Sequence, residues 1–154
     1  GLAHAAPASH EIHGQNRLLN GTFLLLVRGR GRCSLRILII DDEALIANTL
    51  TRLLRGHQVE TMAAAKAVEP ICQGHYDLIL CDIKMPTISG EDLLQLVWER
   101  DPSMAKRFVF ITGGSVARVP GSLSEHTRVL YKPFDRVLLN ELIESVSQEI
   151  GEDG

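Results

Sequence analysis

The chain has 154 residues, a hydrophobic fraction of 45% and a formal net charge of −3. The length suits one domain with a packed core, and the charge argues against non-specific nucleic-acid binding. No apolar run reaches the roughly 20 residues of a membrane span, so we expect no direct contact with a membrane or with nucleic acid. The three cysteines lack zinc-site spacing, which predicts reduced thiols and a cytoplasmic location.

Residues 1–34 are predicted to form a leader that is flexible or loosely attached. The apolar run at 23–27 is too short for a membrane span, and its basic residues follow it rather than precede it, unlike those of a secretory signal. The run Ser9-His10-Glu11-Ile12 resembles the start of the phosphorylated-histidine box of sensor histidine kinases. The Arg-Thr-Pro that continues this box is absent, so His10 is a weak candidate for phosphorylation.

From residue 35 the chain alternates between apolar runs typical of buried strands and segments with helical periodicity. The predicted strands are 35–40, 58–62, 77–81, 108–111 and 128–131. The predicted helices run from Ile46 to Leu54, 63–72, Ser89 to Arg100, 115–124 and Asp135 to Ile150, and Pro70 should shorten or bend the second of these. This alternation predicts an α/β domain over 35–150, a doubly wound five-stranded parallel sheet with helices on both faces, followed by a tail at 151–154.

Polar residues end the long strands of the predicted sheet. Asp41 and Asp42 follow the first strand, and Asp82, Thr112 and Lys132 end the third, fourth and fifth. Because the carboxyl ends of parallel strands share one edge, we expect these side chains to lie together. Three carboxylates repel one another unless a cation is present, and their oxygens suit Mg²⁺. An aspartate can accept a phosphoryl group, whose oxygens lysine and threonine can bind.

Each candidate also has a structural interpretation. Asp41 and Asp42 could cap the first helix, and the Thr112 hydroxyl could bind backbone at a strand end. Lys132 could be an exposed strand-end charge, and the Lys84 side chain is expected to point to solvent. The coincidence of these residue types at the carboxyl ends of four predicted strands favours a functional site.

Four motifs, in this order and spacing, resemble those of the receiver domain of response regulators in two-component signalling. They are Ile39-Ile40-Asp41-Asp42-Glu43, Asp82-Ile83-Lys84-Met85-Pro86 with Ser89-Gly90, Ile111-Thr112-Gly113-Gly114, and Tyr131-Lys132-Pro133-Phe134. The resemblance covers 35–150 and implies a flavodoxin-like sheet in the order 2-1-3-4-5. The Thr-Gly-Gly and Lys-Pro-Phe-Asp sequences are similar to those of receivers attached to hybrid histidine kinases.

The resemblance also implies roles for individual residues. Asp82 would accept a phosphoryl group from a phosphohistidine on a partner histidine kinase or histidine phosphotransfer protein. Thr112 and Lys132 would each bind a phosphoryl oxygen, and the Lys132-Pro133 peptide would be cis. Such a domain catalyses its own phosphorylation and dephosphorylation, and we expect a switch that relays the signal by conformational change rather than a turnover enzyme.

The same resemblance implies a site for Mg²⁺, or Mn²⁺ in its place. Asp42 would bind the ion directly and Asp41 through water, and Asp82 and the backbone carbonyl of Lys84 would complete the protein ligands. Receivers often have an aromatic switch residue three positions before the lysine, but Val129 stands there, so a smaller rearrangement with Thr112 is expected.

Two other classes of function remain open. A phosphatase of the haloacid-dehalogenase kind also uses an aspartyl nucleophile, but it places a second acid two residues later, where this chain has Lys84. The other alternative is a phosphate-independent interaction module. It would dimerise through a face formed by helix 115–124, strand 127–131 and the final helix.

Overall fold

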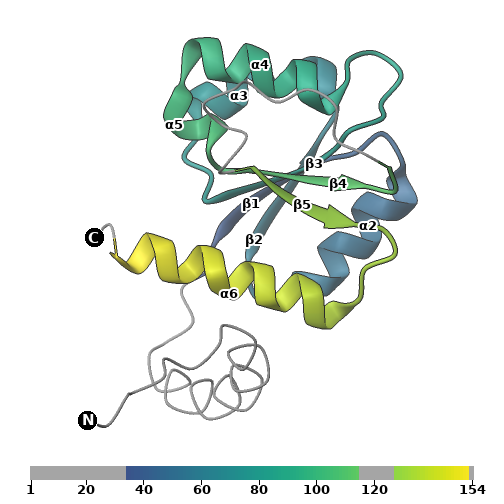
Figure 1. Ribbon diagram of the computed structural model, residues 1–154, viewed down its shortest axis with the longest axis vertical. Helices are drawn as coiled ribbons and strands as arrows, with labels where there is room; N and C mark the ends of the chain where they lie inside the picture. The colour runs from purple at the N-terminus through teal and green to yellow at the C-terminus, as the bar shows by residue number, and fades with distance from the viewer. Residues whose placement is uncertain (1–33, 115–126, 153–154) are drawn as a thin grey trace, which may run out of the picture. The chain divides into compact units, whose positions relative to one another are not determined.

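A computed structural model describes residues 34–114 and 127–152 of the chain (Figure 1). Its centre is a five-stranded sheet in the order β2-β1-β3-β4-β5, and every neighbouring pair of strands is parallel. The strands are β1 Arg36–Ile40, β2 Gln58–Met62, β3 Leu78–Asp82, β4 Phe108–Thr112 and β5 Arg128–Tyr131. The predicted fold and strand order are confirmed.

Burial along the strands explains their sequence patterns. Every residue of β3 and β4 is buried, as expected of inner strands that helices cover on both faces. The edge strands β2 and β5 are more exposed, and β2 accordingly carries polar residues such as Gln58 and Glu60. The carboxyl ends of four strands, β1, β3, β4 and β5, carry the acids, Thr112 and Lys132.

Two helical layers enclose the sheet (Figure 1). Helices α2 Ala44–Leu53 and α6 Arg136–Glu152 pack on one face, around a core that includes Leu50, Leu80 and Leu139. The other face is covered by the 3-10 turn η1 Ala64–Lys66 and by α3 Val68–Gln73, α4 Gly90–Arg100 and α5 Pro102–Ala105. Both layers are needed because the inner strands are apolar on both sides.

The predicted helix ends are confirmed where a side-chain cap or a glycine marks them. Ser89 Oγ accepts a hydrogen bond from the Asp92 amide at 3.1 Å, which caps α4. Asp135 Oδ1 accepts from the Leu138 amide at 2.9 Å at the start of α6. Gly56 follows α2 with a φ of 101°, a backbone angle that residues with a Cβ rarely adopt.

Several predicted boundaries are corrected. The helix predicted at 63–72 is the turn η1 followed by α3, because Pro70 has no amide hydrogen and is tolerated only in the first turn of the helix. Helix α5 was not predicted, and α6 continues to Glu152, beyond the end of the final helix predicted at Ile150. The helix expected at 115–124 and the leader up to residue 33 lie outside the described residues.

The described cysteines are free thiols, as expected. Cys81 is fully buried inside β3, and its burial, together with the nearby Asp82 carboxylate, raises the pKa of the thiol. Cys72 is half-buried in α3. Within residues 34–114 and 127–152, no helix has the length and apolar character that crossing a membrane requires.

Candidate functional site

Asp41 lies directly after β1, and its two carboxylate oxygens have different environments. Oδ1 accepts a hydrogen bond from the Glu43 amide at 2.8 Å, but Glu43 is itself the N-cap of α2 and no side chain caps this helix, so Asp41 does not have the capping role of the structural interpretation. Oδ2 is buried and has no hydrogen-bond partner among the described residues. Burial, reinforced by the nearby Asp82 carboxylate, raises the pKa of Asp41 above its usual value. A buried oxygen with unused lone pairs is costly unless a cation binds it.

Asp82 is the last residue of β3 and is 7% exposed. Its Oδ1 accepts a hydrogen bond from the Ile83 amide at 2.8 Å and lies 4.0 Å from the Lys132 ammonium nitrogen. One carboxylate oxygen is thus held by backbone and faces a cation. This arrangement fixes the direction of the side chain and keeps a positive charge beside it.

Strands β4 and β5 supply the other two residues. Asp82 is paired with Ile111 in the sheet, so Thr112 is the next residue of β4 and lies beside the Asp82 end of β3. Thr112 is 3% exposed, and its Oγ1 accepts from the Gly114 amide at 3.0 Å. The Lys132 amide donates to the Thr112 carbonyl at 2.8 Å, which aligns the two strand ends. The Lys132-Pro133 peptide is cis, as expected.

Three carboxylates come together at this edge, but they are not the three that the sequence predicted. One oxygen each from Asp41, Glu43 and Asp82 lie within 4.8 Å of one another, which is close enough for one cation. Asp42 is exposed and does not belong to this group. Glu43, which was not among the predicted ligands, directly follows the acidic pair, and its amide binds Asp41.

The remaining predicted residues flank this group. The Lys84 side chain is exposed, as expected, and its ammonium nitrogen lies 3.9 Å from the point where a Cβ on Gly114 would stand. Gly114 itself therefore leaves space between Lys84 and Thr112. Val129 is half-buried beside Phe110 of β4 and packs against the core under α3 and α4. Its small side chain joins the core rather than the acidic group.

Gly90 positions the loop that follows Asp82, although in the sequence it stood out only as part of the Ser89-Gly90 motif. Its amide donates to the Ile83 carbonyl at 2.9 Å, so the start of α4 holds the loop after Asp82. A Cβ on Gly90 would stand 2.3 Å from the Asp82 carbonyl oxygen, a distance that no Cβ tolerates. The absence of a side chain here allows α4 to approach the backbone of Asp82.

Replacing this glycine should therefore disturb both stability and the site. We expect Gly90→Ala to lower the free energy of unfolding by about 1–3 kcal/mol, because the methyl group must displace backbone. Urea denaturation measures this loss. The matched control is Gly151→Ala in α6, where a Cβ has no neighbour within 4 Å and the change should be neutral or slightly stabilising. Equal stability of the two variants would contradict the close approach.

Comparisons with known proteins agree with this geometry. Residues 37–144 match the family described as the response regulator receiver domain. The transcriptional regulatory protein BtsR of Salmonella typhi is 32% identical over 120 residues, which is 75% of this chain and 49% of that protein. The receiver protein CpdR of Brucella abortus is 34% identical over 113 residues, 70% of this chain and 92% of that protein. The chain thus spans about half of BtsR and most of CpdR.

Solved structures show the same fold. A CheY-like receiver domain from Methanospirillum hungatei has a TM-score of 0.64 at 28% identity and covers 79% of this chain and 99% of its own. A complex of the histidine kinase ThkA with the response regulator TrrA matches with a TM-score of 0.61 at 27% identity, over 72% and 97% of the two chains. The receiver domain of the Pseudomonas aeruginosa sensor kinase PA1611, with magnesium in its active-site cleft, has a TM-score of 0.60 at 18% identity, over 75% and 99%.

Proposed function

Because this chain belongs to the response-regulator receiver domain family, we propose that it takes a phosphoryl group from a phosphohistidine of a partner kinase or phosphotransfer protein onto Asp82. The main support is the position of Asp82 at the end of β3. Its Oδ1 lies 4.0 Å from the Lys132 ammonium nitrogen, and one of its carboxylate oxygens lies within 4.8 Å of oxygens from two other carboxylates. An isolated structural acid would need no such surroundings. Incubation with acetyl phosphate and Mg²⁺ should add one phosphoryl group to the intact mass, and an unchanged mass would contradict the proposal.

The side chains around Asp82 suggest how the transfer proceeds. A carboxylate oxygen of Asp82 attacks the phosphorus, the phosphorus–nitrogen bond to the donor histidine breaks, and the imidazole leaves with the bonding electrons. Lys132, already facing the Asp82 carboxylate, would pair with one phosphoryl oxygen. The Thr112 hydroxyl accepts from the Gly114 amide, and its own hydrogen would bind another phosphoryl oxygen.

We propose that Asp41, Asp42, Asp82 and the Lys84 carbonyl hold Mg²⁺, or Mn²⁺ in its place. The buried, unpartnered Oδ2 of Asp41 and the convergence of carboxylates fit a hard divalent cation. When bound, such an ion would neutralise charge on the transferring phosphoryl group. Glu43 is the alternative to Asp42 as the third carboxylate ligand, since its oxygen is the one grouped with those of Asp41 and Asp82. Asp42 stays in the proposed set because it directly follows Asp41 at the carboxyl end of β1.

The surface beside the site would receive the phosphohistidine partner. Leu45, Val137 and Leu138 are 76%, 61% and 46% exposed. Leu45 lies in the first turn of α2, soon after the acids, and the other two lie in the first turn of α6, soon after Lys132. Exposed apolar side chains next to a reactive group are typical of an interface. The kinase–regulator complex among the structural neighbours supports this class of partner.

Truncating these side chains should slow phosphorylation by a protein donor and leave phosphorylation by a small donor unchanged. A phosphotransfer screen first identifies a histidine kinase that phosphorylates the chain. We expect Leu45→Ala and Leu138→Ala each to slow phosphotransfer from this kinase about tenfold, which is the size of a lost interface contact. Phosphorylation by acetyl phosphate should not change. Leu96→Ala, which removes a 42% exposed leucine of α4, is the control and should leave both rates unchanged. Equal loss with both donors would show damage to the site instead of to docking.

A phosphate-independent interaction module of the same fold is the second candidate. Tyr131 is 58% exposed on the edge strand β5, which belongs to the predicted dimer face. Light scattering of the full chain with and without beryllofluoride, a phosphoryl mimic, distinguishes the two. A dimer that forms equally in both conditions would favour the constitutive module.

A further inference from the structure

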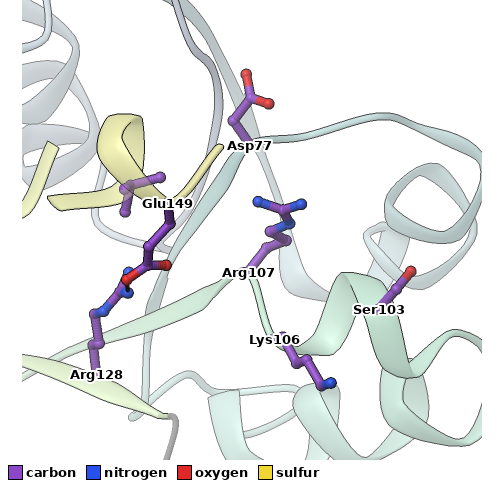
Figure 2. A pocket seen from close by; sticks show the side chains of 7 residues that line it. Asp77, Ser103, Lys106, Arg107, Arg128 and Glu149 are labelled. Carbon is purple, nitrogen blue, oxygen red and sulfur yellow. Dashed lines mark hydrogen bonds and ion pairs between the residues drawn. The ribbon is translucent and has the colours of Figure 1, made fainter. Parts of the chain in front are cut away.

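A polar pocket lies at the edge of the sheet opposite the acidic site. It has a volume of about 320 Å³ and is lined by residues that precede or begin β3, β4 and β5 and by residues of α5 and α6. Its charged and hydroxyl side chains are those of Asp77, Ser103, Lys106, Arg107, Arg128 and Glu149 (Figure 2). Because parallel strands of five residues span about 16 Å, this pocket is separate from the Asp82 site.

The two acids of this pocket already have partners. Asp77 Oδ2 accepts a hydrogen bond from the Arg36 amide at 2.8 Å, which joins the starts of β1 and β3. Glu149 of α6 is paired with the Arg128 guanidinium. The charge of Glu149 is therefore neutralised by Arg128, whereas Asp77 is held by a neutral amide and keeps its charge.

Two of the three cationic side chains, those of Lys106 and Arg107, have no such partner among the described residues. Neither Lys106 nor Arg107 forms a side-chain hydrogen bond or ion pair with any other residue of the described part of the chain. Figure 2 shows the Arg107 guanidinium in the middle of the lining side chains, between Asp77 and the Arg128–Glu149 pair. A half-buried guanidinium without a carboxylate partner retains donors that can bind an anion.

We propose that this pocket binds a small multivalent phosphate anion, such as pyrophosphate or the diphosphate group of a nucleotide. Arg128 and Glu149 neutralise each other, and Lys106 and Arg107 against the single acid Asp77 leave the pocket with a net positive charge. Arginine offers a planar fork of donors that matches phosphate oxygens, and lysine adds a mobile point charge. The volume lies at the lower end of the range for small-ligand pockets. Recognition of phosphate at this edge is independent of phosphoryl transfer at Asp82.

The test is a titration of the full ¹⁵N-labelled chain with pyrophosphate at low ionic strength. EDTA is present, so that the acidic site holds no metal and repels anions. We expect saturable shifts of the Lys106, Arg107 and Arg128 amides. Lys106→Gln and Arg107→Gln should each weaken binding about tenfold or more, the value of a lost charged hydrogen bond. Lys66→Gln, an exposed charge on η1 outside the pocket, should bind like the wild type.

Titrations with two other anions, malonate and ADP, define the chemistry of the ligand and its source. Malonate carries two carboxylates and should bind more weakly than pyrophosphate. ADP that binds more tightly than pyrophosphate would assign the phosphate to a nucleotide, and equal affinity would assign it to the inorganic ion. The amide spectrum of Lys106→Gln confirms the fold, since this side chain is exposed. Absence of saturable shifts, malonate binding as tight as pyrophosphate binding, or undiminished binding by Lys106→Gln would overturn the proposal.

Discussion

The variant Asp82→Asn is expected to lose phosphoryl uptake completely. The amide has nearly the same shape as the carboxylate and can still accept the hydrogen bond from the Ile83 amide, so the fold should be retained. It lacks the anionic oxygen that attacks phosphorus. Intact mass spectrometry after incubation with acetyl phosphate and Mg²⁺ measures the effect, and the wild type should gain one phosphoryl group.

The matched control is Asp77→Asn, at the other end of the same strand. Its carboxylate accepts from the Arg36 amide, a role that an asparagine oxygen can keep. This variant should take up phosphate like the wild type. If Asp82→Asn gains the phosphoryl mass as readily as Asp77→Asn, the acceptor is a different residue.

The variant Asp41→Asn should be more stable than the wild type without metal and should lose the stabilisation that Mg²⁺ gives the wild type. The asparagine keeps the contact of Oδ1 with the Glu43 amide and replaces the buried, unpartnered Oδ2 with a donor group near Asp82. We expect a gain of about 1 kcal/mol in the free energy of unfolding in EDTA. Urea denaturation with and without Mg²⁺ measures both effects, and a ligand that binds only the folded state should raise the wild-type value.

The contribution of Asp41 to the free energy of unfolding should decrease as the pH rises. Burial and the Asp82 charge raise the pKa of Asp41 in the folded protein above its usual value of 3.8, so the folded state holds this proton more tightly than the unfolded state. In the metal-free wild type, this contribution to stability is present below the unfolded pKa and is lost as the pH rises through the folded pKa. Asp41→Asn should show a smaller decrease over this window, and identical slopes would contradict the cause assigned to the shift.

A pair of variants identifies the third metal ligand. Asp42→Asn should weaken Mg²⁺ binding more than Glu43→Gln, as the proposed ligand set requires. The reverse order would transfer this role to Glu43, in agreement with the grouping of its carboxylate with Asp41 and Asp82.

The sheet and the phosphoacceptor edge could be predicted because each depends on a strong local signal. The inner strands are continuous apolar runs, and the polar residue that ends each run lies at the carboxyl edge once the strands are parallel. Asp82 and Lys132 were therefore placed together by topology alone, 50 positions apart in the chain. The cis peptide after Lys132 followed only from the family resemblance.

Other features depend on side-chain geometry that the sequence does not contain. Which of two adjacent acids turns toward Asp82 is decided by side-chain rotation, so Glu43 could not be distinguished from Asp42. Helix α5 was not predicted, although the sequence carries a signal for its start. Asp101 accepts from the Ser103 and Met104 amides, and Pro102 is the first residue of the helix, a combination typical of a helix start. The close approach of Gly90 to the Asp82 carbonyl is a tertiary contact without a local pattern.

Chemical trapping of the phosphorylated residue tests the proposed mechanism most directly. An aspartyl phosphate is an acyl phosphate, which borohydride reduces to homoserine, so peptide sequencing by mass spectrometry identifies the acceptor. The wild-type chain treated with acetyl phosphate and Mg²⁺ should yield homoserine at position 82, and the sample with EDTA should yield none. Homoserine at Asp41 or Asp42 instead, or equal yields with and without the metal, would contradict a metal-dependent acceptor at the tip of β3.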